Sequence, residues 1–385
     1  MKYNFDKIPE RRNTNSVKWD SYPADRLPLW VADTDFEVCP KILDAIRKRL
    51  EHPVLGYSLD DPELLQVVCS RMLERYGWHV VPEDLILVPG IVSGFNFAIR
   101  AYCGNDDTVI YQTPAYPPFI LAPGHFQLKG ICNDLYYDPE EEIWKIDFDR
   151  FEEQIQDNTS LFILCNPHNP VGRVFTPEEL TRLGDICLKH NVKICSDEIH
   201  NEIIYKGYRH TPIASLNERF SANTITFIAP SKTFNIPGLS CSIAIVQDPE
   251  MRSRYKKALE HLSSGVTVLS QAAGLAAYRD CGDWMSEQMD YLEENRDFAQ
   301  AYVRGNMPLI RQNRIEATFL MWLDCSALGI EGSPAEFFAE KAHVQLNDGK
   351  RFGPGYEKFV RVNLGTNRAT LAEALSRMKK ALDER

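Results

Sequence analysis

The sequence predicts an α/β fold in which a mostly parallel sheet lies between helices. Six apolar runs of strand length, rich in β-branched and aromatic residues, occupy the middle of the chain, at 85–88, 108–111, 161–164, 192–195, 224–228 and 242–246. Segments with helical patterns lie between several of these runs. Strands that alternate with helices form parallel sheets covered on both faces, so this order favours such a sheet.

The clearest helical pattern follows the third run, at 176–190. Thr176 is a good N-cap, Pro177 suits the first helical position, and Glu179 completes a capping box. The apolar residues that follow share one helix face: Leu180, Leu183, Ile186 and Cys187. We therefore expect a helix here, with that face buried.

The two ends of the chain differ from this alternating pattern. The start contains Pro- and Trp-bearing turns, and the end contains long charged helices with strand patterns at 317–324 and 359–364. These ends are α+β in character. We therefore expect a large central domain over 46–284 and a small domain built from 1–45 and 285–385.

Composition restricts the possible partners and the compartment. The chain has 385 residues, 44% hydrophobic and 25% charged, with a net charge of −11. Nucleic-acid phosphates and anionic membranes favour clustered Lys and Arg, so neither is an expected partner. No apolar run is long enough to span a bilayer, and the polar segment 1–12 lacks the apolar core of a signal peptide. We therefore expect a cytoplasmic protein.

Several common cofactor and metal motifs are absent from the sequence. The ten cysteines form no Cys-x-x-Cys pair and are expected to be reduced, mostly buried thiols. The sequence also lacks Gly-x-Gly-x-x-Gly, Gly-x-x-x-x-Gly-Lys-Ser/Thr and His-Glu-x-x-His. Dinucleotide, P-loop nucleotide and zinc sites therefore lose their usual support, and no metal is expected.

Chemically useful side chains follow five of the apolar runs, where the strands are expected to end. They are Gly90 before a helix, Tyr116, Asn169, Asp197 with His200, and Lys232. Ligands bind beyond the carboxyl ends of parallel strands, so we expect these groups on one rim of the sheet.

Each of these residues alone has an ordinary explanation, such as a turn, an Asx turn, a helix cap or a surface lysine. Their occurrence at successive strand ends favours a cofactor site instead. A lysine such as Lys232 can form a Schiff base with an aldehyde cofactor. The helix that Gly90 introduces can hold that cofactor's phosphate at its N-terminus.

At these positions the sequence resembles the fold-type I pyridoxal-phosphate (PLP) enzymes of the aspartate aminotransferase superfamily. The resemblance covers nearly the whole chain and is strongest to the C–S lyase branch, the MalY/PatB-type cystathionine β-lyases. The segments that carry it are KWD at 18–20, LWVADTDF at 29–36, GY at 56–57, NPHNPVG at 166–172, SDEIH at 196–200 and SKTFN at 231–235. It implies the PLP-dependent transferase fold, and a homodimer with active sites at the subunit interface.

The resemblance also implies roles around the cofactor ring. Lys232 would hold PLP as a Schiff base and later remove the substrate's Cα proton, with Tyr116, stacked on the ring face, as its catalytic neighbour. Asp197 would pair with the pyridine nitrogen and keep it protonated, so that the ring accepts electrons. Asn169 would bind the ring hydroxyl oxygen and border the substrate, and His200 would contact that oxygen or pack beside it.

Other implied roles concern the phosphate and the substrate. The phosphate would be bound by the backbone amides of Ile91 and Val92, by Ser231, and by Tyr57 of the other subunit. Arg361 would grip the substrate carboxylate through its planar guanidinium, and Ala32 would lie against the substrate backbone. Without the motif, an exposed ion pair at a strand end would be the simpler interpretation of Arg361.

Three positions differ from common patterns in the superfamily. Many aminotransferases carry Arg eight residues after the lysine, where this chain has Ser240, and Tyr three residues after the aspartate, where it has His200. Both differences fit the lyase branch. Thr34 stands where the branch would lead us to expect Met, which is a mild change.

The resemblance favours α,β-elimination on L-cystathionine or another L-cysteine S-conjugate, giving pyruvate, ammonia and a thiol. Two alternatives stay open: an aminotransferase acting on an amino acid and a keto acid, and a regulatory binding protein on the same fold. Lyase and aminotransferase share their steps up to the carbanion, and no single residue of the sequence separates them. The complete set of Lys232, Asp197, Asn169, Tyr116 and Arg361 indicates that catalysis is retained.

Overall fold

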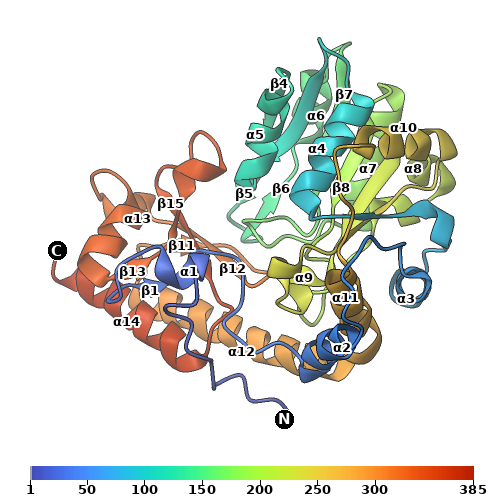
Figure 1. Cartoon of the computed structure of the whole chain (residues 1–385). Coiled ribbons are helices and arrows are strands. Elements are labelled where there is room, and N and C mark those ends of the chain that lie inside the picture. Colours follow the sequence, from blue (N-terminus) through green and yellow to red (C-terminus); the bar gives the residue numbers. More distant parts are fainter. Residues whose placement is uncertain (1) are drawn as a thin grey trace.

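The computed structural model describes residues 2–385 and contains a seven-stranded sheet (Figure 1). The strand order is β2-β10-β9-β8-β7-β3-β4. The bounds are β2 Leu85–Val88, β3 Thr108–Thr113, β4 Lys129–Asp134, β7 Thr159–Cys165, β8 Lys193–Asp197, β9 Thr224–Ile228 and β10 Ser242–Ile245. Strand β10 runs antiparallel to both neighbours, and every other pairing in this sheet is parallel. The predicted mostly parallel sheet is confirmed.

Two hydrophobic layers cover the two faces of this sheet. Leu161 and Ile163 of β7 join one layer, and Phe162 and Leu164 join the other, because successive strand side chains point to opposite faces. The first layer includes helices α4 Ile91–Tyr102, α5 Pro117–His125 and α10 Pro249–Leu259. The second includes α6 Phe148–Gln154, α7 Pro177–Lys189, α8 Glu218–Ser221 and the hairpin of β5 Tyr136–Asp138 with β6 Ile143–Lys145.

Helix α7 begins through the predicted capping box. The Thr176 hydroxyl accepts from the Glu179 amide at 3.2 Å, and the Glu179 carboxylate accepts from the Thr176 amide at 2.8 Å. The predicted apolar face of the helix is buried. Local sequence therefore determines both the start and the orientation of this helix.

The two chain ends meet in a second region, beside a four-stranded sheet of order β11-β12-β15-β14 (Figure 1). Its elements are α12 Gly282–Asn306, β11 Arg311–Gln312, β12 Leu320–Asp324, α13 Pro334–Phe337, β13 Val344–Gln345, β14 Asn347–Asp348, β15 Phe359–Asn363 and α14 Arg368–Asp383. The N-terminal strand β1, Leu27–Pro28, pairs in parallel with β13. The division at 46–284 stays a prediction, and both of its limits fall inside helices, α2 Pro40–Leu50 and α12.

The strand predicted at 317–324 begins later than expected. Ala317 instead forms an isolated bridge to Ile204, and Thr318 has a φ of 70°, a left-handed conformation that interrupts an extended strand. Strand β12 therefore starts at Leu320. The predicted start was wrong, because the apolar pattern does not reveal this local backbone turn.

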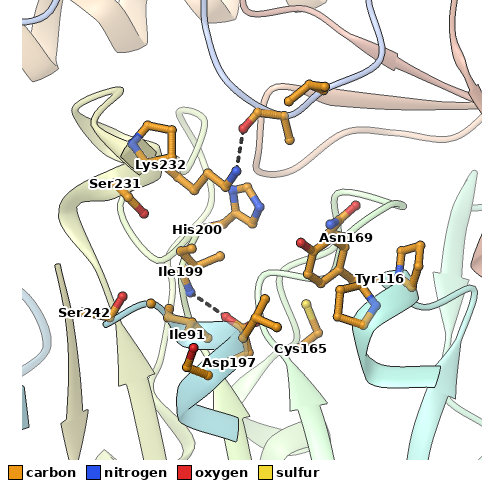
Figure 2. Close-up of a pocket in the computed structure, with 18 of the residues that line it drawn as sticks. Ile91, Tyr116, Cys165, Asn169, Asp197, Ile199, His200, Ser231, Lys232 and Ser242 are labelled. Atoms are coloured by element: carbon orange, nitrogen blue, oxygen red, sulfur yellow. Dashed lines mark hydrogen bonds between the residues drawn. The ribbon is translucent and has the colours of Figure 1, made fainter. Parts of the chain in front are cut away.

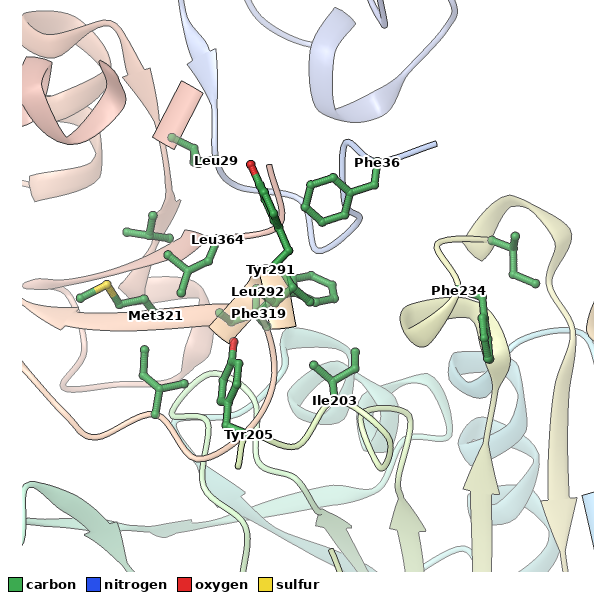
Figure 3. Close-up of a cluster of buried hydrophobic side chains, with 14 of the residues drawn as sticks. Leu29, Phe36, Ile203, Tyr205, Phe234, Tyr291, Leu292, Phe319, Met321 and Leu364 are labelled. Carbon is green, nitrogen blue, oxygen red and sulfur yellow. The ribbon is translucent and has the colours of Figure 1, made fainter. Parts of the chain in front are cut away.

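A hydrophobic cluster joins the N-terminal segment to both sheets (Figure 3). Leu29 and Phe36 of that segment lie near Leu292 of α12, with Phe234 and Phe319 from the two sheet regions. Phe36 also packs edge-on against Phe5, with ring centroids 5.0 Å apart. These apolar contacts hold the N-terminal segment against the body of the protein. The remaining helices are α1 Val17–Asp20, α3 Pro62–Tyr76, α9 Pro230–Thr233 and α11 Val268–Asp280.

Residues 2–385 contain neither a membrane-spanning helix nor a metal-binding cluster. No helix in this range has the length and apolar character needed to cross a membrane. Its His, Cys, Asp and Glu side chains do not gather into a group able to hold a metal ion.

Candidate active site

A cavity of about 530 Å³ lies beyond the carboxyl ends of β7, β8 and β9 (Figure 2). Cys165 and Asp197, which end β7 and β8, line it together with Lys232, which follows β9. Residues 30–32 of the N-terminal segment and Arg361 of β15 also line it. The volume is typical of a small-molecule site, and the position is the rim predicted from the strand ends.

Lys232 projects into this cavity from α9, the short helix after β9. Its Nζ donates a hydrogen bond of 2.5 Å to the carbonyl oxygen of Ala32 (Figure 2). Burial, together with the nearby Arg361 guanidinium, lowers the pKa of Lys232 from its ordinary 10.5 to about 8. Asp33 and Asp197 oppose this shift. The amine is therefore a far better nucleophile and base near neutral pH than an exposed lysine.

Asp197 stands at the base of the cavity with one carboxylate oxygen free. Its Oδ1 accepts from the backbone amide of Ile199 at 3.0 Å, and no group of residues 2–385 donates to Oδ2. Burial raises the pKa of Asp197 to about 7, and the neighbouring Glu198 acts in the same direction. A cation placed against the free oxygen would stabilise the ionised form.

Arg361 and Asn169, 192 positions apart in the sequence, are brought into contact. Arg361 donates to Asn169 Oδ1 at 3.0 Å, to the Trp30 carbonyl at 3.0 Å, and to Asn347 Oδ1. A guanidinium has five N–H donors, so three bonds leave two donors for a ligand, including the buried Nε. Burial lowers the pKa of Arg361 to about 10, and it remains a cation at neutral pH.

The start of helix α4 offers unused backbone amides beside the cavity. Gly90 has a φ of 99°, which glycine tolerates, and it turns the chain from β2 into the helix. The first intrahelical bond runs from Gly94 to Gly90 at 3.0 Å, so the amides of Ile91, Val92 and Ser93 have no backbone acceptor in residues 2–385. The hydroxyl-bearing residues Ser231, Ser240 and Ser242 line the same cavity. Such an arrangement suits an anion.

The remaining predicted residues fall into two groups. Tyr116 and His200 both line the cavity, and burial keeps the pKa of His200 well below its ordinary value, so the imidazole is neutral. Ala32 also lines it. Tyr57, in contrast, is fully exposed and lies outside the cavity of its own chain. Its predicted contact with a phosphate of the other subunit stays a prediction.

A buried ion cluster stabilises the N-terminal segment and accounts for two of the matched motifs. Lys18 donates to Asp35 at 3.0 Å, with both side chains buried. Arg11 bridges Asp33 at 2.6 Å and Asp35 at 2.7 Å, and the Trp19 indole donates to Asp35 at 2.8 Å. The cluster balances two cations against two carboxylates, so the burial of charge is compensated.

The comparisons with known proteins agree with this geometry. A sequence profile described as aminotransferase class I and II matches residues 25–378. The chain belongs to this family. Cystathionine beta-lyase PatB of Bacillus subtilis is 38% identical, over 98% of this chain and 100% of its own.

Two solved structures are similar to this chain over nearly its full length. Cystalysin from Treponema denticola, whose structure contains a pyridoxal 5′-phosphate cofactor, is 34% identical, with a TM-score of 0.95 and 100% of both chains covered. The PLP-bound C–S lyase from Staphylococcus hominis is 32% identical, with a TM-score of 0.93, covering 99% of this chain and 98% of its own. The sequence-based resemblance and the expected fold are thereby confirmed.

The residues of the cavity fit the family's cofactor. PLP carries an aldehyde, a basic ring nitrogen and a phosphate, which require an amine, a carboxylate and an anion site. The free oxygen of Asp197, the amine of Lys232 and the unused amides at 91–93 supply these three groups in one cavity. PLP is therefore the cofactor of this protein.

Several residues that line the cavity were not singled out from the sequence. They include Trp30, Ile199, Ser242, Asn347 and Arg351. Trp30 and Ile199 lie inside the matched segments 29–36 and 196–200, and Ser242 begins a predicted strand. Their positions in these segments could have marked them as site residues. Asn347 and Arg351 carry no local signal, because tertiary folding alone brings their loop to the site.

Proposed function

We propose that this protein is a PLP-dependent C–S β-lyase. Its substrate is L-cystathionine or another L-cysteine S-conjugate, and its products are pyruvate, ammonia and a thiol. One observation carries the proposal: Lys232, Asp197 and Arg361 line a single cavity. Supporting it, two relatives matched over nearly the full length, 38% and 33% identical, are named cystathionine beta-lyase.

The residues around Lys232 prepare proton removal. PLP, when bound, withdraws electrons from the substrate's α carbon. Asp197 would keep a proton on the ring nitrogen through its free oxygen, and that positive charge would favour the ionised carboxylate. The Nζ of Lys232 would take the Cα proton as a free amine, and burial and the Arg361 guanidinium, which lower its pKa to about 8 in this cavity, favour that neutral form. Tyr116 would stack on the ring, and His200, a neutral imidazole that lines the same cavity, would lie beside it.

Arg361 and the N-terminal segment orient the substrate. The two free donors of Arg361 bind the α-carboxylate, while Asn169 and Asn347 hold the guanidinium in place. Ala32 borders the substrate backbone. This orientation holds the Cα–H bond near Lys232, so the proton is positioned for transfer to the amine.

The overall conversion is balanced by water. The Cα–H and Cβ–S bonds break, the thiolate leaves with a proton, and the remaining three-carbon fragment is hydrolysed to pyruvate and ammonia. An aminotransferase would instead return a proton to the cofactor carbon and require a keto acid as second substrate. The similarity to named C–S lyases favours elimination.

We also propose that the protein forms a homodimer with shared active sites. Tyr57 lies in a loop that exposes four large apolar side chains, Val54, Leu55, Tyr57 and Leu59. Such a run of exposed apolar surface is typical of an interface. In the dimer Tyr57 would donate to the phosphate in the partner's site. Light scattering should give twice the chain mass, and Tyr57→Phe should weaken PLP binding; a monomer with unchanged PLP affinity would contradict this.

We place the protein in the cytoplasm. Its ten cysteines are free thiols, and thiols persist in a reducing compartment. Cell fractionation with an antibody against the chain should recover it with cytoplasmic marker enzymes. Recovery with an exported marker would refute this placement.

The test of the proposed function is product formation from L-cystathionine and S-ethyl-L-cysteine, with PLP and no keto acid. We expect pyruvate, ammonia and thiol in equal amounts, at a rate that 2-oxoglutarate does not increase. Glutamate formation that depends on 2-oxoglutarate, without thiol release, would show an aminotransferase instead. Absence of turnover in the PLP-loaded protein with both substrates would reject the proposal.

A further inference from the structure

A second cavity, of about 290 Å³, adjoins the active site. Trp30, Asn347 and Arg351 line both cavities, so the two share part of their walls. The second cavity extends away from Lys232 toward α13. When the amino-acid end of the substrate occupies the first cavity, the substituent on its sulfur needs an adjoining space, and the second cavity provides one.

Some charged side chains that line the second cavity form ion pairs, and others do not. Lys350 is held by Glu336 at 3.3 Å and by Asp348 at 3.0 Å. Arg351, the next residue, makes no side-chain hydrogen bond or ion pair with any group of residues 2–385. It is exposed to solvent and retains its full donor set. A free guanidinium at the junction of two cavities can bind an anion without breaking an existing bond.

Arg351 lines the active-site cavity as well as the second cavity. Its charge lowers the pKa of Arg361 and, in opposition to burial, that of Tyr116, so it acts on both walls of the first cavity. Arg361 and Arg351 therefore both line the first cavity, and Arg26, which donates to Gln345 Oε1 at 3.2 Å, lines the second. One substrate carboxylate can satisfy Arg361, and a second anion would satisfy Arg351.

An unpaired acid completes the second cavity. Glu340 lines it and makes no ion pair or side-chain hydrogen bond with residues 2–385. Tyr22 and Trp30 form an aromatic wall, with ring centroids 5.3 Å apart. A free cation, a free acid and an aromatic wall complement a zwitterionic group on a short aliphatic chain.

We propose that Arg351 is a specificity-determining residue that binds a carboxylate on the leaving-thiol side of the substrate. Glu340 accepts the ammonium group of the same end. The enzyme therefore prefers S-conjugates whose leaving thiol is itself an amino acid over those with a neutral alkyl thiol. This inference rests on the proposed β-lyase function and assigns the second cavity to the distal half of the substrate.

The test compares two substrates in three proteins. The wild type, Arg351→Gln and Lys341→Gln are assayed for pyruvate with L-cystathionine and with S-ethyl-L-cysteine. Lys341 is the matched control, since it is exposed, makes no ion pair in residues 2–385 and lines neither cavity. We expect Arg351→Gln to raise KM for L-cystathionine at least about tenfold with kcat within about twofold, as for a lost binding contact. S-ethyl-L-cysteine and the control should change by less than about twofold.

A binding measurement separates recognition from catalysis. In 2,7-diaminosuberate a methylene replaces the sulfur of cystathionine, so no thiol can leave. Calorimetry should show about tenfold weaker binding to Arg351→Gln than to wild type, with L-norleucine binding equally to both. Arg351→Lys, which keeps the charge but not the planar fork, should recover part of the loss.

The outcomes distinguish this inference from the proposed function. If the wild type releases no pyruvate from either substrate, the β-lyase function fails. If it converts both, and Arg351→Gln changes both KM values equally or neither, Arg351 does not determine specificity. A selective KM increase accompanied by weaker diaminosuberate binding supports the inference.

Discussion

The environment of Lys232 predicts that the cofactor-free protein captures an aldehyde at unusually low pH. Burial and the Arg361 guanidinium disfavour the ammonium form and lower the pKa of Lys232 from 10.5 to about 8. At about pH 7.5, roughly a quarter of such amines are unprotonated, against roughly 0.1% for an ordinary lysine. The reactive fraction is therefore about 200-fold larger.

Stopped-flow absorbance with pyridoxal measures this directly, because pyridoxal lacks the phosphate whose own ionisation would complicate the profile. The second-order rate of capture by the cofactor-free protein should rise with pH and level off through an apparent pKa near 8. Nα-acetyl-lysine under the same conditions should still be rising above pH 10. A protein profile that follows the free amino acid would refute the reasoning.

A substitution of Asp33 tests the direction in which this carboxylate shifts the pKa of Lys232. Asp33 raises the pKa of Lys232 by stabilising its ammonium form, so Asp33→Asn should move the apparent pKa below that of the wild type. Asp185→Asn, an exposed carboxylate on α7, is the control and should leave the profile unchanged. A shift of Asp33→Asn to higher pH would contradict the assigned electrostatics.

Three further predictions follow from contacts in and near the site. Asp197→Asn removes a charged hydrogen bond of about 1.5–3 kcal/mol and should weaken PLP binding about 10- to 150-fold in a fluorescence titration; equal affinity would refute its pairing with the cofactor. Arg361→Ala should raise KM for L-cystathionine at least about 30-fold with a smaller change in kcat; an unchanged KM would remove its carboxylate-binding role. Lys18→Met leaves Asp35 short of a buried partner and should lower the free energy of unfolding by about 3–5 kcal/mol in urea titrations. The surface ion pair of Lys379 with Asp383 gives the control, because Lys379→Met should lower the free energy of unfolding by about 0.5 kcal/mol or less. Equal losses of stability in Lys18→Met and Lys379→Met would contradict the argument.

Local sequence was sufficient for most of the central sheet and for its rim. Apolar runs located every strand of this sheet except β4, Lys129–Asp134, which was not predicted from the sequence. Asp197 and Lys232 could be assigned to one cavity because Asp197 ends one strand and Lys232 lies shortly after the next. Because the strands are parallel, their carboxyl ends lie at the same edge of the sheet, which brings these residues together. The capping residues of α7 were equally visible, because a capping box is a contact between neighbours in sequence.

Contacts between distant segments were not visible in the sequence. The bond between Arg361 and Asn169 joins the two sheets, and the second cavity around Arg351 forms only where the N-terminal segment meets β14. The ion pair of Lys18 and Asp35 needs a specific chain path through the N-terminal segment. Pattern and propensity describe neighbours along the chain, so such long-range pairings remain outside their reach.

The most direct test of the account is to locate the lysine that holds PLP. The protein loaded with PLP is reduced with borohydride, digested and mapped by mass spectrometry, with Lys232→Ala treated in parallel. The account predicts one pyridoxyl group per chain, on Lys232, and none in the variant. A label on another lysine, or equal labelling of the variant, would contradict the assignment of this cavity as the active site.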